Sequence, residues 1–340
     1  MFNKILNYIT KTIKEEYKFI ILLILLYCIF TFPLNYYITI GGGASDVSSR
    51  IDVVDKDKVK SKGSFNISYV TQLEGTILTY LTSYIIPGWE REDANNYKYT
   101  KNESIEDIDF RGDLDLKVAN ENAKYWAYTL ADKSVQQISS KLYVIAVTDE
   151  YKVPLKIQDQ VLSIDDYSYP TVKEYVNYLQ TKKVGDTVNV KVIRKNKEKV
   201  IPCELHKAKD KVVLGVGLEY LTEYKTDPEV KIAFKKSESG PSGGLITTLE
   251  IYNQLTKEDL TKGKIITGTG TIEQDGTIGE IGGVEHKLLG AAEAKSDVFL
   301  VPSGDNYKEA IKYKKEKKLK VKVIEVKNIE QAIKKLGDLK

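Results

Sequence analysis

Residues 238–255, ESGPSGGLITTLEIYNQL, place a serine among glycines directly before an apolar run. The apolar residues of this run recur at helical spacing, at Leu245, Leu249 and Tyr252. The spacing predicts a helix whose N-terminal end lies close to Ser242. The positive end of that helix, with the backbone N–H groups of Ser242 and Gly243, would hold the oxyanion that forms when a nucleophile attacks a carbonyl. Ser242 is therefore a candidate nucleophile, although a serine at such a position more often only caps the helix.

A serine nucleophile needs a base, and the chain has only two histidines, His206 and His286. Residues 284–294 form a second predicted helix, on which Lys287 shares a face with the small residues Gly290, Ala291 and Ala294. A lysine on an inward face is desolvated, and desolvation lowers its pKa toward neutrality. The neutral amine of Lys287 could then accept the proton of Ser242. His286 lies about 100° away around the same helix, near solvent.

Three motifs resemble the proteolytic domain of the Lon proteases: Gly240-Pro241-Ser242, Thr269-Gly270 after a predicted strand, and Gly282-Gly283-Val284-Glu285-His286-Lys287. The resemblance covers residues 212–336 and implies a Lon-protease-like α/β domain over residues 211–340. It implies a serine/lysine dyad in which Ser242 is the nucleophile and Lys287 the general base. It also implies that the hydroxyl of Thr269 hydrogen-bonds to the lysine. Thr267 remains an alternative for this third role, because the sequence TGTG allows two alignments.

Two positions depart from the Lon pattern, since the family usually has alanine at position 243 and the acidic residue near the motif is Glu238. Neither removes the dyad, but the missing methyl group at Gly243 bears on how rigidly the serine is held. The chain contains no G-x-x-x-x-G-K-[ST] motif. We therefore expect neither a nucleotide partner nor the ATP-driven unfolding module of full Lon.

Residues 141–208 alternate short strands with one helix. Their order, carried by residues 155–194, LKIQDQVLSIDDYSYPTVKEYVNYLQTKKVGDTVNVKVIR, resembles a PDZ domain, although Gln158 stands where that family usually has glycine. The resemblance implies a groove between the strand at 142–147 and the helix at 172–180, where an extended peptide would add as a strand. The residues expected at this groove are Leu142, Tyr143, Val144, Val172 and Val176. A purely structural spacer is the alternative.

Residues 19–40, FIILLILLYCIFTFPLNYYITI, run for 22 residues without a charge. As a helix they would span about 33 Å, enough to cross a bilayer. Lysines precede this segment, so the positive-inside rule places residues 1–18 in the cytoplasm and the chain from residue 41 onward outside the cell. We expect an uncleaved transmembrane anchor. A signal peptide, with Pro33 breaking the run and small residues following it, is the alternative.

The composition, 42% hydrophobic and 29% charged residues in 340, predicts a globular chain of about two domains. The net charge is only +3, which argues against a nucleic-acid partner. Cys28 and Cys203 lie far apart in different contexts, which excludes a disulfide scaffold and a cysteine-based zinc site. We expect no metal and no other cofactor.

The order of anchor, PDZ-like unit and Lon-like domain resembles the PDZ-containing Lon-type membrane proteases of Gram-positive bacteria. It implies an α+β multidomain fold and an extracytoplasmic, ATP-independent serine endopeptidase in which the PDZ-like unit recruits substrate. The expected partners are a peptide or membrane-protein substrate and the lipid bilayer, and a homo-oligomer is possible. Residues 41–140 form a mixed region to which we assign no chemistry. The alternative function is a non-catalytic peptide-binding scaffold with a degenerate Lon domain.

Overall fold

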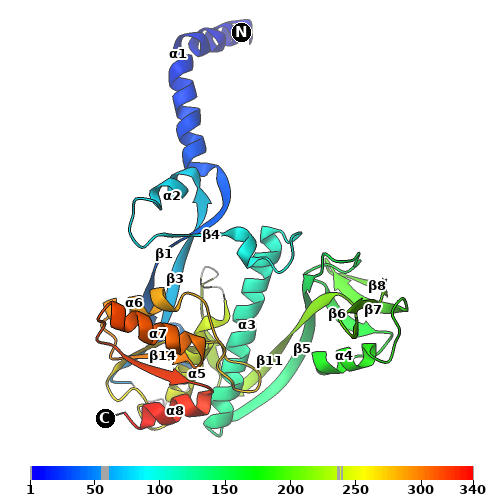
Figure 1. Cartoon of the computed structure of the whole chain (residues 1–340), viewed down its shortest axis with the longest axis vertical. Coiled ribbons are helices and arrows are strands. Elements are labelled where there is room, and N and C mark those ends of the chain that lie inside the picture. The colour runs from blue at the N-terminus through cyan, green and yellow to red at the C-terminus, as the bar shows by residue number, and fades with distance from the viewer. Residues whose placement is uncertain (1, 55–60, 236–237, 239, 340) are drawn as a thin grey trace. The chain divides into compact units, whose positions relative to one another are not determined.

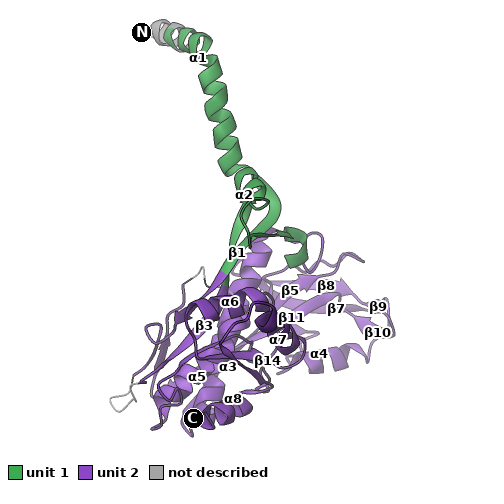
Figure 2. Cartoon of the chain, turned by 60° about the vertical axis from the view of Figure 1, so that its left-hand side comes forward, with its two compact units in different colours: residues 1–41, 70–97 green, residues 42–69, 98–340 purple. Residues whose placement is uncertain are grey.

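The computed structural model describes residues 2–54, 61–235, 238 and 240–339. The chain forms two compact units, one from residues 1–41 and 70–97 and the other from residues 42–69 and 98–340 (Figure 2). Two long strands, β1 (Pro33–Asp46) and β3 (Ser64–Thr76), contribute residues to both units.

The first unit begins with α1 (Phe2–Thr31), which is kinked at Glu16 (Figure 1). The helix ends before Pro33, because proline disfavours a helical conformation in the residue that precedes it. The tyrosines, isoleucines and threonine that follow suit a strand, and β1 pairs antiparallel with β4 (Glu90–Asp93). The unit also contains two short helices, α2 (Ile77–Thr82) and η1 (Ala94–Tyr97).

The helix expected over residues 19–40 is correct only as far as Thr31, since residues 33–40 form strand. The uncharged run has no periodicity that separates helix from strand, and Pro33 was weighed only as a sign of a signal peptide and not as the end of the helix. Within the described residues, no helix combines the length and the hydropathy that crossing a membrane requires.

The second unit contains a parallel sheet in the order β15-β14-β13-β3. Its C-terminal strands are β13 (Ile265–Gly268), β14 (Val298–Pro302) and β15 (Lys322–Val326). Side chains alternate between the two faces, so that Ile266 and Leu300 belong to one core and Phe299 to another.

Helices cover both faces of this sheet. The core of Ile266 and Leu300 includes residues of α5 (Gly244–Leu255) and α8 (Ile329–Gly337). The core of Phe299 includes residues of α6 (Val284–Glu293) and α7 (Asp305–Glu316). The predicted helices that carry the Ser242 and Lys287 motifs therefore lie on opposite faces of one sheet.

Residues 41–140, to which the sequence assigned no chemistry, contribute strands and a helix to this second unit. Residues 64–67 of β3 pair directly with β13, and β2 (Ile51–Val53) pairs with β12 (Val230–Ile232). The same region also contains the long helix α3 (Ile105–Leu130), which packs against α5. Its buried residues in the shared core are Ala123, Ala127 and Tyr128.

Residues 134–227 contain a five-stranded antiparallel sheet in the order β11-β5-β6-β7-β8. The strands are β5 (Ser134–Val147), β6 (Gln160–Ile164), β7 (Thr187–Arg194), β8 (Lys197–Glu204) and β11 (Val216–Asp227). The helix α4 (Val172–Leu179) packs on the sheet, and β9 (His206–Ala208) and β10 (Lys211–Val213) form a hairpin. The β5 and β11 strands form a long ribbon whose pairing runs from Val147 and Val216 to Ser134 and Asp227.

Candidate active site

Ser242 lies in a single 3-10 turn, η2 (Pro241–Gly243), that leads directly into α5. Gly240, just before the turn, has φ 99° and ψ 158°, a conformation that residues with a side chain rarely adopt. The N-cap residue of α5 is Gly243, and no side chain caps this helix. The half-buried Ser242 hydroxyl is therefore not used as a helix cap, contrary to the simpler interpretation of the sequence.

The loop that follows β13 is hydrogen-bonded to the backbone around Ser242. The Gly270 N–H donates to the Ser242 carbonyl at 2.8 Å, and the Leu245 N–H donates to the Gly270 carbonyl at 3.1 Å. Gly244 lies so close to this loop that an added Cβ would be 2.9 Å from the backbone nitrogen of Ile272. The glycines of the motif thus allow two backbone segments to touch, which fixes the serine turn against the sheet edge.

The two candidate threonines occupy different surroundings. The Thr269 hydroxyl donates to the Ser242 carbonyl at 3.3 Å. The Thr267 hydroxyl is hydrogen-bonded to the Ser296 hydroxyl at 2.6 Å. Both threonines are fully buried, but only Thr269 is in contact with the serine turn.

Lys287 lies on α6 and is only 4% exposed. Gly290 and Ala291, its neighbours on the predicted inward face, are buried as well. Burial lowers the pKa of Lys287 from 10.5 to about 8, because the charged ammonium loses its hydration. Within the described residues, no hydrogen bond joins the Lys287 ammonium to the Ser242 hydroxyl.

Small residues are needed on this face because β1 passes directly against α6. A Cβ added at Gly290 would lie 2.6 Å from the backbone nitrogen of Gly43. A Cβ added at Gly42 would lie 2.6 Å from the carbonyl oxygen of His286. The backbones of α6 and β1 are therefore in close contact beside the position of Lys287.

Two polar residues outside the Lon-like motifs form hydrogen bonds on either side of Thr269, one to the end of β13 before it and one to the loop after it. The Ser68 hydroxyl, on β3, donates to the Gly268 carbonyl at 3.0 Å. The Asn122 side chain, on α3, donates to the Ile272 carbonyl at 2.9 Å. Sequence reasoning missed both, because an isolated serine in a strand or asparagine in a helix has no pattern of its own.

α3 also contacts the serine loop and the PDZ-like ribbon. The Gly240 N–H donates to the Gly112 carbonyl at 3.2 Å. The Tyr224 N–H, on β11, donates to the Glu121 carboxylate at 2.9 Å. One helix therefore holds the backbone before Ser242, the loop after Thr269 and the strand that leads to the PDZ-like sheet.

Two carboxyl groups of this unit titrate far from their ordinary range. Burial raises the pKa of Asp115, on α3, to about 6, and that of Glu219, on β11, to about 7. For Asp115 the positive charge of Arg111 opposes this rise and the negative charge of Glu273 adds to it, whereas for Glu219 the charges of Asp115 and Glu273 both contribute to it. Each of these values lies below the pKa of Lys287.

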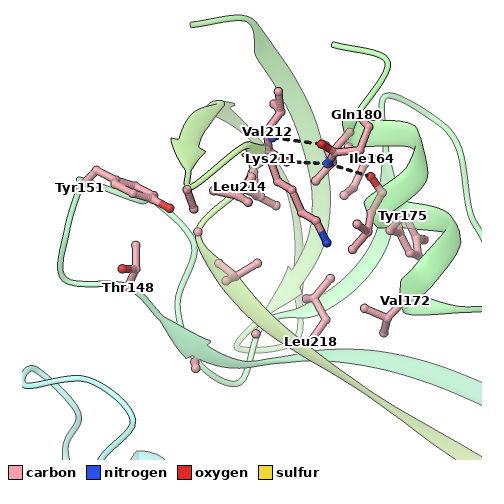
Figure 3. Close-up of a pocket in the computed structure, with 18 of the residues that line it drawn as sticks. Thr148, Tyr151, Ile164, Val172, Tyr175, Gln180, Lys211, Val212, Leu214 and Leu218 are labelled. Atoms are coloured by element: carbon pink, nitrogen blue, oxygen red, sulfur yellow. Dashed lines mark hydrogen bonds between the residues drawn. The ribbon is translucent and has the colours of Figure 1, made fainter. Parts of the chain in front are cut away.

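The groove of the PDZ-like sheet lies beside β11, with a volume of about 380 Å³ (Figure 3). Its lining is mainly apolar and includes Val172 and Val176 of α4, as the resemblance implies, and Leu218 of β11. At one end of the groove, the Gln180 side chain accepts from the Val212 N–H at 3.1 Å and donates to the Val212 carbonyl at 2.8 Å (Figure 3).

The expectation that the strand at 142–147 forms the open edge of the groove is corrected by the pairing of β5. One edge of this strand is paired with β11 as far as Val147, and the other edge pairs with β6 at Leu142 and Tyr143. Leu142 and Val144 are buried in the core beneath the groove, and the Tyr143 ring packs against Phe110, 5.8 Å between ring centres. The covering strand begins about 70 residues after β5, which no local pattern reveals.

Comparison with known proteins defines two domains in this chain. A PDZ-domain family model matches residues 127–205, and the model of the Lon protease (S16) C-terminal proteolytic domain matches residues 232–337. These matches define a protein that joins a PDZ domain to a Lon-type proteolytic domain. The chain therefore matches the PDZ-containing Lon-type proteases.

Solved structures similar to the chain include PDZ domains of two Listeria proteins. The PDZ domain of the SdrC-like protein from Listeria monocytogenes is 27% identical, with a TM-score of 0.22, over 24% of this chain and 92% of that one. The corresponding domain from Listeria innocua is 30% identical, with a TM-score of 0.21, over 23% and 92%. No curated protein matches the chain significantly.

The contact between Gly243 and Ile67 yields a prediction about the glycine that departs from the family pattern. A Cβ at Gly243 would lie 2.9 Å from the Ile67 Cδ1, so Gly243→Ala should destabilise the protein by about 1 kcal/mol through overpacking. Ile67→Val removes that atom. The loss in free energy of unfolding in the double variant should therefore be smaller than the sum of the losses in the two single variants. Urea unfolding and peptide hydrolysis of all four proteins measure this coupling, with Ile67→Val as the matched control. Strict additivity would mean that the contact does not constrain the serine turn.

Proposed function

We propose that this chain is a serine endopeptidase in which Ser242 attacks the substrate carbonyl and Lys287 transfers the proton. The observation that carries the proposal is the burial of Lys287, which lowers the pKa of its amine from 10.5 to about 8, so that near pH 8 about half of the amine is neutral and able to act as a base. The Lon-type match, residues 232–337, contains both side chains and Thr269.

In this mechanism the neutral Nζ of Lys287 takes the proton from Ser242 as its Oγ bonds to the carbonyl carbon. The N–H groups of Ser242 and Gly243 hold the oxyanion, since the first N–H groups of a helix have no partner within it. The Lys287 ammonium then protonates the leaving amine, which leaves an acyl group on Ser242. The neutral Nζ of Lys287 then takes a proton from a water molecule, whose oxygen attacks the ester carbon. The Lys287 ammonium returns this proton to the Ser242 Oγ as the bond between Oγ and the acyl carbon breaks. The Thr269 oxygen orients Lys287 by accepting a hydrogen bond from the lysine ammonium. The Thr269 hydroxyl at the same time donates a hydrogen bond to the Ser242 carbonyl.

The PDZ domain would recruit substrate in this proposal. An extended peptide segment would lie in the groove between α4 and the start of β11 and add to the sheet edge. The apolar lining favours a segment with apolar side chains. Because the chain has no phosphate-binding loop motif, we propose that cleavage is independent of ATP and limited to peptides or accessible parts of membrane proteins.

We also propose that the chain is attached to the cell membrane, with residues 1–18 cytoplasmic and the catalytic unit outside. Residues 19–31 of α1 carry no charge, and their large apolar side chains are exposed around the helix. A helix that is apolar all round suits a lipid environment better than a contact on one side. The lysines that precede the segment favour this orientation.

The dyad predicts a specific pattern of lost activity. Ser242→Ala and Lys287→Met should each abolish hydrolysis of an unstructured fluorogenic peptide, and the double variant should be no worse than either, because the two residues act as a unit. Lys287→Arg should fail as well, since a guanidinium does not deprotonate near neutrality. His286→Ala, one position away on α6, is the control and should retain activity. Substantial cleavage by the folded Lys287→Met variant would refute the mechanism.

The pH dependence follows from the lowered pKa of Lys287. Below about pH 8 the amine is protonated and cannot act as a base, so kcat/KM should fall about tenfold per pH unit in this range and level off above it. Asp115→Asn and Glu219→Gln remove the carboxyl groups that titrate at about 6 and about 7, and should leave this limb in place. A limb near pH 10 in the native protein would mean that the Lys287 amine keeps its ordinary pKa, which would contradict the lowering by burial on which the proposal rests.

The groove assignment predicts that recruitment and chemistry can be separated. Val176→Trp should fill the groove, because Val176 lines it from an exposed position on α4. Cleavage of a natural substrate should fall while hydrolysis of a short unstructured peptide is retained, since recruitment raises only the local concentration. Val184→Trp, exposed and outside the groove lining, is the control. Equal loss on both substrates would assign the PDZ domain a supporting role in the active site instead.

A further inference from the structure

The first unit carries a second apolar surface besides α1. Residues 77–89, ILTYLTSYIIPGW, contain no charge, and charged residues return only at Glu90. Three consecutive large side chains, at positions 84–86, are exposed, with Tyr84 at 63% and Ile85 at 79%. Leu81, one turn earlier, is 56% exposed. An apolar surface of this kind in a folded protein marks a contact with a partner or a membrane.

This interfacial patch, defined as residues 77–89, is held in a fixed conformation. The Thr76 side chain forms a capping box at the start of α2. The Ser83 hydroxyl donates to the Tyr80 carbonyl at 2.6 Å and accepts from Arg91 at 3.1 Å. The Arg91 guanidinium lies 3.8 Å from the centre of the Tyr84 ring. These interactions hold the segment in one conformation in which its apolar side chains are exposed. Their exposure therefore needs an explanation.

The patch is next to the exposed apolar helix of the same unit, because α2 packs against α1 (Figure 1). The uncharged residues 19–31 of α1 cover about 20 Å at 1.5 Å per residue, whereas the hydrocarbon layer of a bilayer is about 30 Å thick. The apolar surface of the unit continues beyond Thr31 through the exposed side chain of Phe32 and through α2. Helix and patch together form one larger apolar surface.

The side chains of the patch have the chemistry of a membrane interface. Tyrosine and tryptophan, present as Tyr80, Tyr84 and Trp89, are the residues that gather at the level of lipid headgroups. Arg91 lies against the aromatic surface with its charge on a long stem, as cations do when they reach from an apolar layer to headgroups. We infer that residues 77–89 insert into the interfacial layer of the bilayer beside α1, an inference that rests on the proposed membrane attachment.

The test uses Trp89 as a reporter in the full chain, bound to vesicles of phosphatidylcholine and phosphatidylglycerol. The chain has two tryptophans, so the emission of a Trp89→Phe variant, which retains Trp126, is subtracted. Lipids with brominated acyl chains should quench most of the Trp89 emission, and aqueous iodide should quench little. Ile85→Asp combined with Ile86→Asp should reverse this order, while the protein still floats with the vesicles through α1. Val200→Asp, which places a charge on an exposed apolar position of β8, is the control and should behave as the native chain.

Vesicle flotation separates failure of this inference from failure of the attachment on which it rests. A chain that does not float would refute the membrane attachment itself. If the chain floats but iodide quenches Trp89 and bromolipids do not, the patch faces water and the inference is overturned. Protection of Trp89 from both quenchers would mean that protein covers the patch, which also overturns it. Hydrolysis by Ser242 is not involved in any of these measurements.

Discussion

The parallel pairing of β13 with β3 is the contact on which the catalytic unit depends. It joins strands about 200 residues apart, with Ile265 opposite Ser64 and Gly268 opposite Ile67. In β3, Ile67 lies against Gly243. The next residue, Ser68, donates a hydrogen bond from its hydroxyl to the carbonyl of Gly268, the last residue of β13. The proteolytic domain is therefore incomplete as the C-terminal third alone, because one central strand of its sheet comes from before the PDZ domain.

α3 is the second element that combines distant parts of this unit. Its adjacent residues Glu121 and Asn122 contact different partners, the first β11 and the second the loop after Thr269. The strand that lines the groove of the PDZ domain and the loop that contacts Ser242 are thus both hydrogen-bonded to one helix. Tyr128, on the same helix, is buried, and its hydroxyl donates to the carbonyl of Pro228, the residue just after β11. α3 therefore also holds the end of β11, where the chain returns from the PDZ domain.

The sequence predicted the parts of the site that depend on local patterns. The glycine-rich serine turn, the inward face of α6 and the burial of Lys287 all follow from residue spacing and size within one helix, and the structure has each of them. It did not predict that β11 covers β5, that β3 completes the sheet or that the apolar run at residues 19–40 changes to strand after Thr31. The first two features depend on pairings between segments far apart in the sequence. The third depends on Pro33, which ends the helix although the residues on both sides of it are uncharged.

The β5 and β11 ribbon has a consequence for how such a chain can diversify. Its two strands leave and rejoin the catalytic unit side by side, at Ser134 and Asp227. A domain inserted between neighbouring ends adds its own core without stretching the host, which is why insertions at such sites are tolerated. The PDZ domain is thus an insertion that can be exchanged. Its specificity can change through replacement or remodelling of residues beyond the ribbon, while the sheet, the serine turn and the buried lysine keep their inherited arrangement.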